Sequence, residues 1–425
     1  MLLFETLVGG LAAIALLAGC ATQAPENPIG HGGLSSDGLA AIEAAMQSAV
    51  DQGQVGGVVT LVYRHGEIAQ VNALGWQDKA RTTPMSRGSI FRIASMTKPI
   101  TSVAALLLWQ QGKFELDDPV DRWLPELANR QVLRNPTDPL DSGVPAQRPI
   151  QVIDLLTHRS GLVTPRNEPG PLRAALTQAD ANNSVGYDQW LAWIGELPLA
   201  HEPGSTFNYG NSIDVLAIFV ERVSGMLFPD FLHERIFKPL AMNDTAFLIP
   251  TEKSSRAARL QSLGGVPASW IPSSNRVPGF PSGAGGLYST ADDYLKFARM
   301  LLGHGALGHV RILEPETVDA MTTNHLTPEQ REGRPFGGSS PHWAGQGFGL
   351  GVAIQQNPSM VTPELGIASR GSFGWPGIFG TWWCADPRED MILIYLVPGG
   401  DAKPGRWAFQ REAYRAIGAI ASPSN

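Results

Sequence analysis

Residues 91–100 read FRIASMTKPI, and this stretch places a serine and a lysine three residues apart just before a proline. Proline is tolerated in the first turn of an α-helix, where its missing N–H breaks no hydrogen bond, and is costly further in. Pro99 therefore predicts a helix that starts close to Ser95 and continues through the apolar residues 100–109. At a spacing of i, i+3, Ser95 and Lys98 lie on one face of that helix, close enough to interact.

A hydroxyl beside an amine, at a helix end where backbone N–H groups are still unpaired, is a candidate activated nucleophile. Taken alone, the pattern Ser-x-x-Lys is weak evidence, because a single chance match in a chain of this length has roughly even odds. Its value therefore depends on partners elsewhere in the sequence.

The composition is that of an ordinary globular protein. The chain has 425 residues, 43% of them hydrophobic and 17% charged, which is long for one domain and sufficient for two. Its formal net charge of −7 gives no reason to expect nucleic acid as a partner. The nine histidines are scattered without metal-ligand spacing, and no glycine-rich phosphate loop precedes a helix, so we expect neither a metal nor a cofactor.

The N-terminal residues resemble an export signal. Residues 7–17 are apolar and lead into Leu17-Ala18-Gly19-Cys20, which resembles a bacterial lipobox, in which a cysteine after small residues is acylated. We expect residues 1–19 to be a lipoprotein signal and residues 20–36 a tether, with Cys20 as a lipid anchor in the bacterial cell envelope. A plain secretory signal, which would leave the protein secreted, and a buried cysteine are the alternatives.

Strand patterns gather at the two ends of the chain and helical patterns between them. Strands are predicted at 55–63, 68–74, 348–354, 379–385 and 391–397, and a terminal helix at 407–420. Helices dominate from about residue 100 to about residue 247, with patterns at 150–156, 187–197, 212–223 and 229–237. We therefore expect an α+β fold, in which an antiparallel sheet built from both chain ends is flanked by N- and C-terminal helices, with a mainly helical domain inserted between them.

The same pattern predicts the domain boundaries. Residues 37–98 and 284–425 are expected to form a discontinuous α/β domain, and residues 99–283 the mainly helical domain, with a site at their interface. Two long loops, 135–149 and 251–286, are typical of the walls or lids of such a site.

Five segments carry a resemblance to a known family. FRIASMTKPIT (91–101), DLLTHRSGL (154–162), YGN (209–211), GAGGLYSTADDYLKF (283–297) and the WPG strand at 375–377 occur in the order and spacing of the serine β-lactamase and penicillin-binding-protein superfamily. Over about residues 35–420 the chain most resembles the class C-related carboxylesterases called family VIII esterases. The resemblance implies a two-domain β-lactamase-like fold and a serine hydrolase.

The resemblance also implies roles for three side chains. Ser95 is the expected nucleophile, Lys98 its activating neighbour, and Tyr209 the general base that passes the proton on to the leaving group. The chemistry of the residues agrees, since a free tyrosine has a pKa of about 10 and needs a close cation to act near neutral pH. Whether Lys98 itself accepts the proton stays open.

Further positions are expected around the acyl carbonyl. The backbone N–H groups of Ser95 and Ile378 are the expected oxyanion hole. Gly377 and Trp375 are expected to contact the substrate, although Trp375 could equally be a core residue. Asn211 is expected to bind the acyl carbonyl or to orient the neighbouring lysine, with a helix cap as the alternative.

The third motif departs from the β-lactamases, where its first position is a lysine that helps hold the carboxylate of the substrate. Here that position is Trp375, whose indole cannot replace the charge. We therefore expect a carboxylesterase that hydrolyses neutral small-molecule esters of short acyl chains, with weak or absent β-lactam turnover. The sequence does not predict the oligomeric state.

Two alternatives stay open. A β-lactamase or D-alanyl-D-alanine carboxypeptidase would use the same three side chains on another substrate, and a non-catalytic envelope lipoprotein would bind peptidoglycan fragments. An α/β-hydrolase is excluded, because its Gly-x-Ser-x-Gly signature is absent from the chain.

Overall fold

The computed structural model describes residues 31–165, 169–181, 185–261, 279–331, 345–360, 368–400 and 402–418. The expected signal at 1–19, Cys20 and most of the tether at 20–36 lie outside these residues, as do residues 262–278 of the second long loop. Within the described part of the chain, no helix has both the length and the apolar character needed to cross a bilayer.

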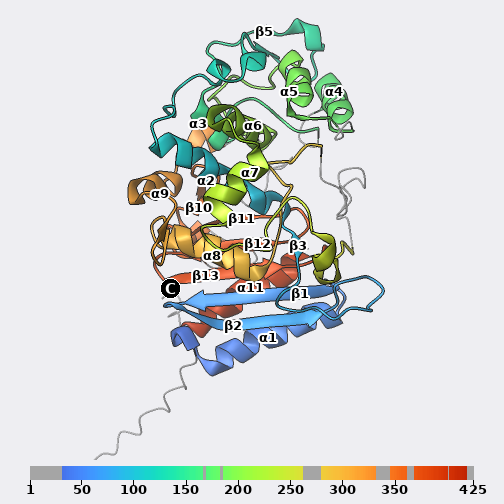
Figure 1. The fold of residues 1–425 in the computed structure, drawn as a ribbon, viewed down its shortest axis with the longest axis vertical. Coiled ribbons are helices and arrows are strands. Elements are labelled where there is room, and N and C mark those ends of the chain that lie inside the picture. The colour runs from blue at the N-terminus through green and yellow to red at the C-terminus, as the bar shows by residue number, and fades with distance from the viewer. Residues whose placement is uncertain are drawn as a thin grey trace, which may run out of the picture.

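A seven-stranded antiparallel sheet forms the centre of the fold (Figure 1). Its strand order is β2-β1-β13-β12-β11-β10-β9, so that the two ends of the chain meet where β1 pairs with β13. The strands are β1 (Gly57–Arg64), β2 (Glu67–Gly75), β9 (Gln346–Phe348), β10 (Ala353–Gln355), β11 (Phe373–Pro376), β12 (Trp382–Asp386) and β13 (Met391–Leu396).

Helices cover both faces of this sheet. Successive side chains of a strand point to opposite faces, so β13 contributes Leu393 and Tyr395 to one core and Ile392 and Ile394 to the other. The first core is closed by the terminal helices, and the second by α8 together with the helical region (Figure 1). These covering helices are α1 (Ser36–Asp51), α11 (Ala402–Ala416) and α8 (Ala291–Leu302).

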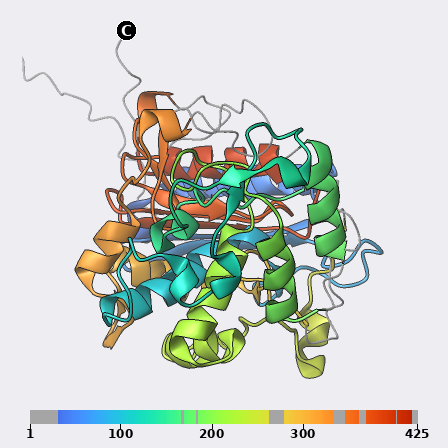
Figure 2. The ribbon, with the colours of Figure 1, turned by 90° about the horizontal axis from the view of Figure 1, so that it is seen from above.

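The chain between the two halves of the sheet forms a mainly helical region, which lies above the sheet in Figure 1 and is seen end-on in Figure 2. Helix α2 is buried on every side from Thr97 to Leu108, which explains its continuous apolar run. The helices of this region are α2 (Thr97–Gln110), α3 (Val152–Leu156), α4 (Gly170–Ala181), α5 (Tyr187–Glu196), α6 (Ser212–Ser224) and α7 (Phe228–Leu232).

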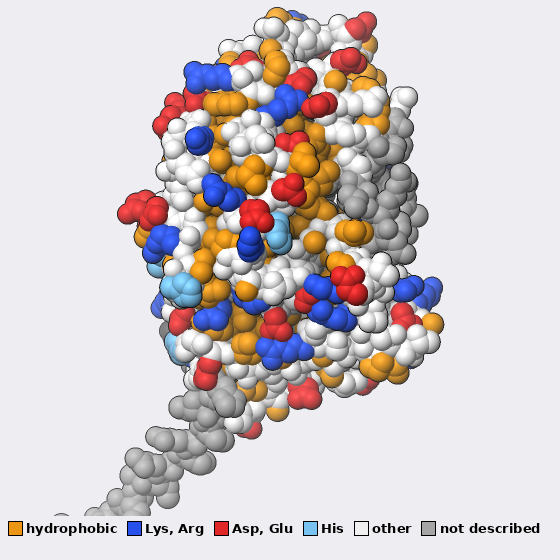
Figure 3. Space-filling view, viewed as in Figure 1, with side chains coloured by type: hydrophobic (Ala, Val, Ile, Leu, Met, Phe, Trp, Pro, Cys, Tyr) orange, Lys and Arg blue, Asp and Glu red, His pale blue; other side chains and the backbone are white. Residues whose placement is uncertain are grey.

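Shorter elements complete the fold. Among the described residues, three two-stranded pairs lie outside the main sheet, and two short helices follow α8 along the chain. They are β3 (Phe91–Arg92) with β6 (Tyr288–Ser289), β4 (Gln131–Val132) with β5 (Val144–Pro145), β7 (Ala306–Leu307) with β8 (Val310–Arg311), and helices α9 (Pro315–Met321) and α10 (Pro328–Arg331). On the face drawn in Figure 3, acidic and basic side chains are interspersed, without a continuous patch of one sign.

The predicted α+β architecture, with an antiparallel sheet made from both chain ends and flanked by terminal helices, is confirmed. The single strand predicted at 348–354 is wrong, because β9 ends at Phe348 and β10 begins at Ala353. The four residues between them are buried, and two of them are glycine; Gly351 makes the turn with φ +93, and the apolar neighbours Leu350 and Val352 mask this turn signal. The domain boundaries expected from the sequence stay a prediction.

The WPG segment also differs from its prediction. Phe373–Pro376 is a strand of its own, and the strand predicted to begin at residue 379 begins at Trp382. A turn separates the two, closed by the N–H of Gly380, which donates to the carbonyl of Gly377 at 3.0 Å. Gly380 has φ +98, a conformation that favours glycine.

Candidate active site

Ser95 lies in a tight turn between β3 and α2. A 3-10 turn at Ala94–Met96 leads directly into α2, and Pro99 occupies the first turn of that helix, as the sequence predicts. Ala94 has φ +46, a left-handed conformation that is uncommon and strained for a residue with a side chain. The turn therefore presents Ser95 in a position that a relaxed backbone would not hold.

Three predicted side chains meet at this turn. The Tyr209 hydroxyl donates a hydrogen bond to Ser95 Oγ at 2.7 Å, and Lys98 Nζ donates to the same oxygen at 3.2 Å. Lys98 Nζ also lies 4.5 Å from the centre of the Tyr209 ring, within the range of a cation–π contact. The structure therefore brings together Ser95, Lys98 and Tyr209, although Tyr209 is 114 residues away from Ser95 along the chain.

The ammonium of Lys98 has a second acceptor. Lys98 is buried, and its Nζ donates to the backbone carbonyl of Ala284 at 2.7 Å. This acceptor is a main-chain atom from the segment before β6, so no side-chain pattern in the sequence points to it. The only signal available to sequence reasoning is the run GAGG at 283–286, in which small residues allow a close approach of the backbone.

His158 packs against the outer side of Tyr209, with 4.6 Å between the ring centres. Its Nδ1 accepts from the N–H of Gly210 at 3.4 Å, and its backbone carbonyl accepts from the N–H of Asn208 at 2.8 Å. Burial, together with the nearby charge of Lys98, lowers the pKa of His158 well below its usual 6.5. The imidazole is therefore neutral near physiological pH and free to accept at Nδ1, which fixes the segment that carries Tyr209.

Trp375 is both a core residue and a neighbour of the site. It is buried on β11 and packs edge-on against Phe348, with 5.2 Å between the ring centres. Its indole N–H donates to the Tyr209 hydroxyl at 3.4 Å. Trp375 therefore reaches the same oxygen that bonds Ser95, while most of its ring belongs to the core.

The end of β11 lies against the nucleophile turn. A Cβ atom on Gly377 would come within 2.5 Å of the Ile93 carbonyl oxygen and 3.4 Å of the Ala94 Cβ, so this approach requires glycine. The turn is tied to the same carbonyl by the Thr381 hydroxyl, which donates to it at 3.1 Å. Ile378 follows Gly377, and 44% of its surface is exposed, which is unusual for a large apolar residue in this structure.

Asn211 is not brought into contact with the predicted lysine partner. Its side chain is buried, Nδ2 has no hydrogen-bond partner, and no hydrogen bond joins Asn211 to Lys98. It also makes no capping bond, although α6 begins at the next residue. Instead, Asn211 lines a small cavity in the helical region together with Arg130 and Leu162.

The described residues hold neither a metal-ligand cluster nor an exposed thiol. In the described part of the chain, no three His, Cys, Asp or Glu side chains gather as they would around a metal ion. Cys384 is buried on β12, and burial raises the pKa of its thiol, which suits a core residue rather than a nucleophile.

Known proteins resemble this chain over most of its length. The sequence matches the Beta-lactamase family over residues 42–414. The chain belongs to this family. This β-lactamase-family protein is 41% identical over 359 residues to an uncharacterized protein of Mycobacterium tuberculosis, a match that covers 84% of this chain and 88% of the relative.

Relatives with named activities agree with the family. Esterase EstB of Burkholderia gladioli is 30% identical over 387 residues, covering 85% of this chain and 91% of the relative. The solved structure of EstCE1, described as a hydrolase with promiscuous acyltransferase activity, matches with a TM-score of 0.73 and 27% identity, covering 90% of this chain and 99% of that one. The predicted membership of the class C β-lactamase-like serine hydrolases is confirmed, and the protein is an enzyme of that class.

Proposed function

We propose that the protein is a carboxylesterase of the family VIII type, which hydrolyses short-chain acyl esters through an acyl-enzyme on Ser95. The observation that carries this proposal is the double contact at Ser95 Oγ, which is bonded by both Tyr209 and Lys98. The names of EstB and EstCE1 support ester hydrolysis as the reaction.

Acylation uses the Tyr209–Lys98 pair as a base. Ser95 Oγ attacks the ester carbonyl carbon while its proton moves to the pair, and the contact of 2.7 Å serves transfer in either direction. The tetrahedral oxyanion is stabilised by the backbone N–H groups of Ser95 and Ile378. Collapse of this intermediate breaks the bond to the alkoxy group, which leaves as the alcohol with the proton from the pair.

Deacylation repeats these steps with water. The pair takes a proton from a water molecule as the water oxygen attacks the acyl carbonyl. The second intermediate then collapses by breaking its bond to Ser95 Oγ, which regains the proton from the pair as the carboxylic acid leaves. Lys98, 4.5 Å from the centre of the Tyr209 ring, and the indole N–H of Trp375, which bonds the phenol oxygen, place a cation and a hydrogen-bond donor beside Tyr209 during each transfer.

The lining of the site favours neutral substrates. Trp375 occupies the position where the resemblance expects a lysine in β-lactamases, and the exposed Ile378 offers an apolar contact to the acyl or alcohol group. Both features disfavour a β-lactamase or D-alanyl-D-alanine carboxypeptidase, whose substrates carry a carboxylate. Gly377 lets the end of β11 approach the Ser95 turn, and Asn211 stays a proposed contact of the acyl carbonyl.

The test is a series of p-nitrophenyl esters from acetate to laurate, run beside nitrocefin with the wild-type protein and Ser95→Ala. We expect turnover that is highest for the short esters, weak or absent with nitrocefin, and lost in Ser95→Ala. Ser102→Ala is a matched control, since it removes a hydroxyl from the same helix whose oxygen has no hydrogen-bond partner. Preferential turnover of nitrocefin would contradict the proposal.

A second measurement separates catalysis from binding alone. A fluorophosphonate probe should label the wild-type protein and not Ser95→Ala, whereas a non-catalytic peptidoglycan-binding lipoprotein would not be labelled in a Ser95-dependent way. Adding a primary alcohol during ester turnover measures how far the acyl group passes to alcohol rather than to water, the reaction that the description of EstCE1 suggests.

We also propose that the protein is held at the bacterial cell envelope by acylation of Cys20, as the lipobox-like sequence indicates. Metabolic labelling with a palmitate analogue should modify the full-length protein and fail in Cys20→Ala. If Cys20→Ala were labelled as strongly as the wild type, Cys20 would not be the site of acylation.

A further inference from the structure

Asp214 is an acidic side chain close to the site that the mechanism above does not use. It lies in the first turn of α6, the helix that begins directly after the segment carrying Tyr209. Its Oδ1 accepts two hydrogen bonds, from the Ser282 hydroxyl at 2.7 Å and from the N–H of Ala284 at 3.0 Å. The carboxylate therefore holds the 282–284 segment from the α6 side.

The same segment receives Lys98 on its other side. The carbonyl of Ala284 accepts from Lys98 Nζ at 2.7 Å, and the carbonyl of Gly283 accepts from the Thr101 hydroxyl of α2 at 2.7 Å. A continuous chain of contacts thus runs from Asp214 through Ala284 to Lys98 and on to Ser95 Oγ.

Packing leaves this segment little room to move. A Cβ atom on Gly283 would approach the Ala217 Cβ to 2.5 Å, the Ile213 carbonyl oxygen to 3.0 Å and the Thr101 Cγ2 to 3.2 Å. The segment is wedged between α2 and α6, so a displacement of its anchor on α6 is passed on to the carbonyl that accepts from Lys98.

Opposing effects act on the pKa of Asp214, the acidic group near Lys98. Burial raises the pKa of Asp214, while hydrogen bonds from Ser282 and Ala284 and the charge of Lys98 act in the opposite direction. The other titratable groups facing the ammonium are Tyr209, whose ring lies beneath it, and His158, which is neutral.

One more titratable group faces the carboxylate itself. The pKa of Tyr187 is raised well above 10 by burial and by Asp214 and Glu221, so its phenol is neutral and donates to the Pro281 carbonyl at 2.6 Å. Glu221, about two turns further along α6, accepts from the N–H of Phe228. Asp214, by contrast, interacts directly with the charge of Lys98.

We propose that Asp214 is a positioning residue for the acyl-transfer reaction, which holds Lys98 against Ser95 through the 282–284 segment and supplies the counter-charge of the ammonium. This inference rests on the proposed role of Ser95 as nucleophile. In this proposal the segment GAGG at 283–286 places the carbonyl of Ala284 between Asp214 and Lys98.

The test measures the rate at which a fluorophosphonate labels Ser95 as a function of pH, beside kcat/KM for p-nitrophenyl butyrate. Asp214→Asn keeps an oxygen acceptor and removes the charge. We expect its acidic limb to move to lower pH by roughly half a unit or more, because a nearby negative charge favours the protonated pair. Asp214→Ala removes the anchor as well, and we expect labelling to slow by about a hundredfold.

Two matched variants isolate charge from position. Ser282→Ala removes one bond to the carboxylate and keeps the charge, so we expect a loss of about threefold or less and an unmoved limb. Glu221→Gln removes a charge from the same helix away from Lys98, and we expect neither rate nor limb to change.

Thermal unfolding distinguishes positioning from a purely structural role. A carboxyl whose folded pKa is raised makes its full contribution to stability below the ordinary pKa of 3.8, and this contribution is lost as the pH rises through the folded pKa. Asp214→Asn should therefore melt at the same or a higher temperature than the wild type at pH 8. A lower melting temperature with an unmoved acidic limb would overturn the proposal, as would unchanged labelling in both Asp214 variants.

The outcomes also separate this inference from the proposed function. If Ser95 of the wild type is labelled but no ester is turned over, the substrate class is wrong and the labelling profiles still decide the role of Asp214. If the wild type is not labelled at Ser95 at all, both proposals fall.

Discussion

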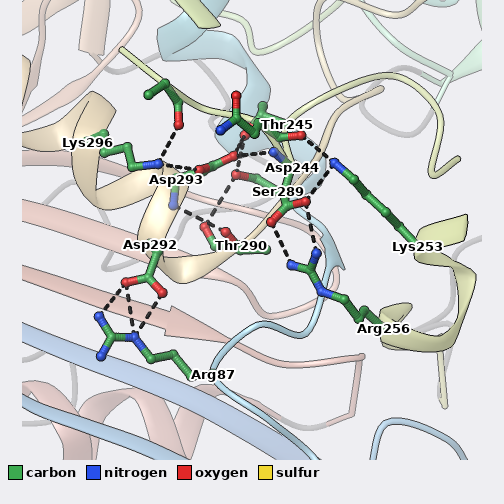
Figure 4. Close-up of polar contacts among 12 residues, drawn as sticks. Arg87, Asp244, Thr245, Lys253, Arg256, Ser289, Thr290, Asp292, Asp293 and Lys296 are labelled. Carbon is green, nitrogen blue, oxygen red and sulfur yellow. Dashed lines mark hydrogen bonds and ion pairs between the residues drawn. The ribbon is translucent and has the colours of Figure 1, made fainter. Parts of the chain in front are cut away.

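Two polar clusters of this molecule differ in how they treat their charges. The site cluster comprises Ser95, Lys98, His158, Tyr209 and Asp214, and the α8 cluster, drawn in Figure 4, comprises Asp244, Lys253, Arg256, Asp293 and Lys296. In the α8 cluster every carboxylate faces a cation or a row of donors. In the site cluster, burial works against the ionisation of Asp214 and His158.

The α8 cluster is arranged so that ionisation stabilises the fold. Asp244 accepts from both terminal nitrogens of Arg256, at 3.0 and 2.6 Å, and pairs with Lys253 at 2.9 Å (Figure 4). The buried Asp293 accepts from the N–H of Asp244 at 2.7 Å and pairs with Lys296 at 2.9 Å. The hydrogen bond from Arg256 is the main reason why the pKa of Asp244 is lowered.

The site cluster shows the opposite signs. Burial raises the pKa of Asp214 and lowers that of His158, and the backbone is left-handed at both Ala94 and His158, with φ of +46 and +54. Such departures cost stability and gather where a protein needs poised groups. The α8 cluster therefore stabilises the fold, whereas the site cluster lowers stability in exchange for reactive groups.

The largest expected effect is on the site cluster. Lys98→Ala removes the cation beside Ser95 and Tyr209, and kcat/KM for p-nitrophenyl butyrate should fall by about ten-thousandfold, equivalent to about 5 kcal/mol. Lys296→Ala, in the α8 cluster, is the matched control and should keep its kcat/KM. If kcat/KM of Lys98→Ala stayed within tenfold of the wild-type value, the two clusters would not differ in function.

The next effect isolates one oxygen atom. Tyr209→Phe keeps the ring contacts with His158 and Trp375 but removes the hydroxyl that bonds Ser95, and kcat/KM should fall by about a thousandfold. Tyr414→Phe removes another buried phenol, bonded to Asp386, and should lose stability without losing activity. If Tyr209→Phe retained most of its rate, Tyr209 would not be the base.

The α8 cluster should respond in stability and not in activity. Because the pKa of Asp244 is lowered, its ionised form stabilises the fold above the ordinary value of 3.8, and this stability is lost as the pH falls through the lowered value. Asp244→Asn should therefore lower the free energy of unfolding by about 1–2 kcal/mol at pH 7, allowing for solvent screening at a partly exposed pair.

Urea titrations at a series of pH values measure this difference. The gap between wild type and Asp244→Asn should close towards pH 3, while kcat/KM per folded molecule stays unchanged at neutral pH. A gap that persists undiminished in acid would mean that Asp244 acts through packing rather than charge.

Some residues of the site cluster could be predicted from the sequence, and others could not. Ser95 and Lys98 are local to one helix start, and Tyr209 is marked by its motif, so pattern alone brings them to attention. The acceptor at Ala284 is a backbone carbonyl and Asp214 is one acid among many, so only tertiary packing reveals either of them. The sheet was predictable from strand patterns at both chain ends. Its turn at 349–352 is marked only by Gly349 and Gly351, which stand among buried apolar residues like those of a strand.

The smallest expected effect tests whether Trp375 belongs to the core or to the chemistry. Trp375→Phe keeps an aromatic ring against Phe348 and removes the N–H that bonds the Tyr209 oxygen at 3.4 Å. A bond of this length contributes modestly, so kcat should fall by about threefold to tenfold, equivalent to about 1 kcal/mol, with KM little changed. A residue that served only the core would instead lower the melting temperature and leave kcat unaltered. Whether the substitution lowers kcat or only the melting temperature therefore decides whether this indole takes part in the reaction or belongs only to the core.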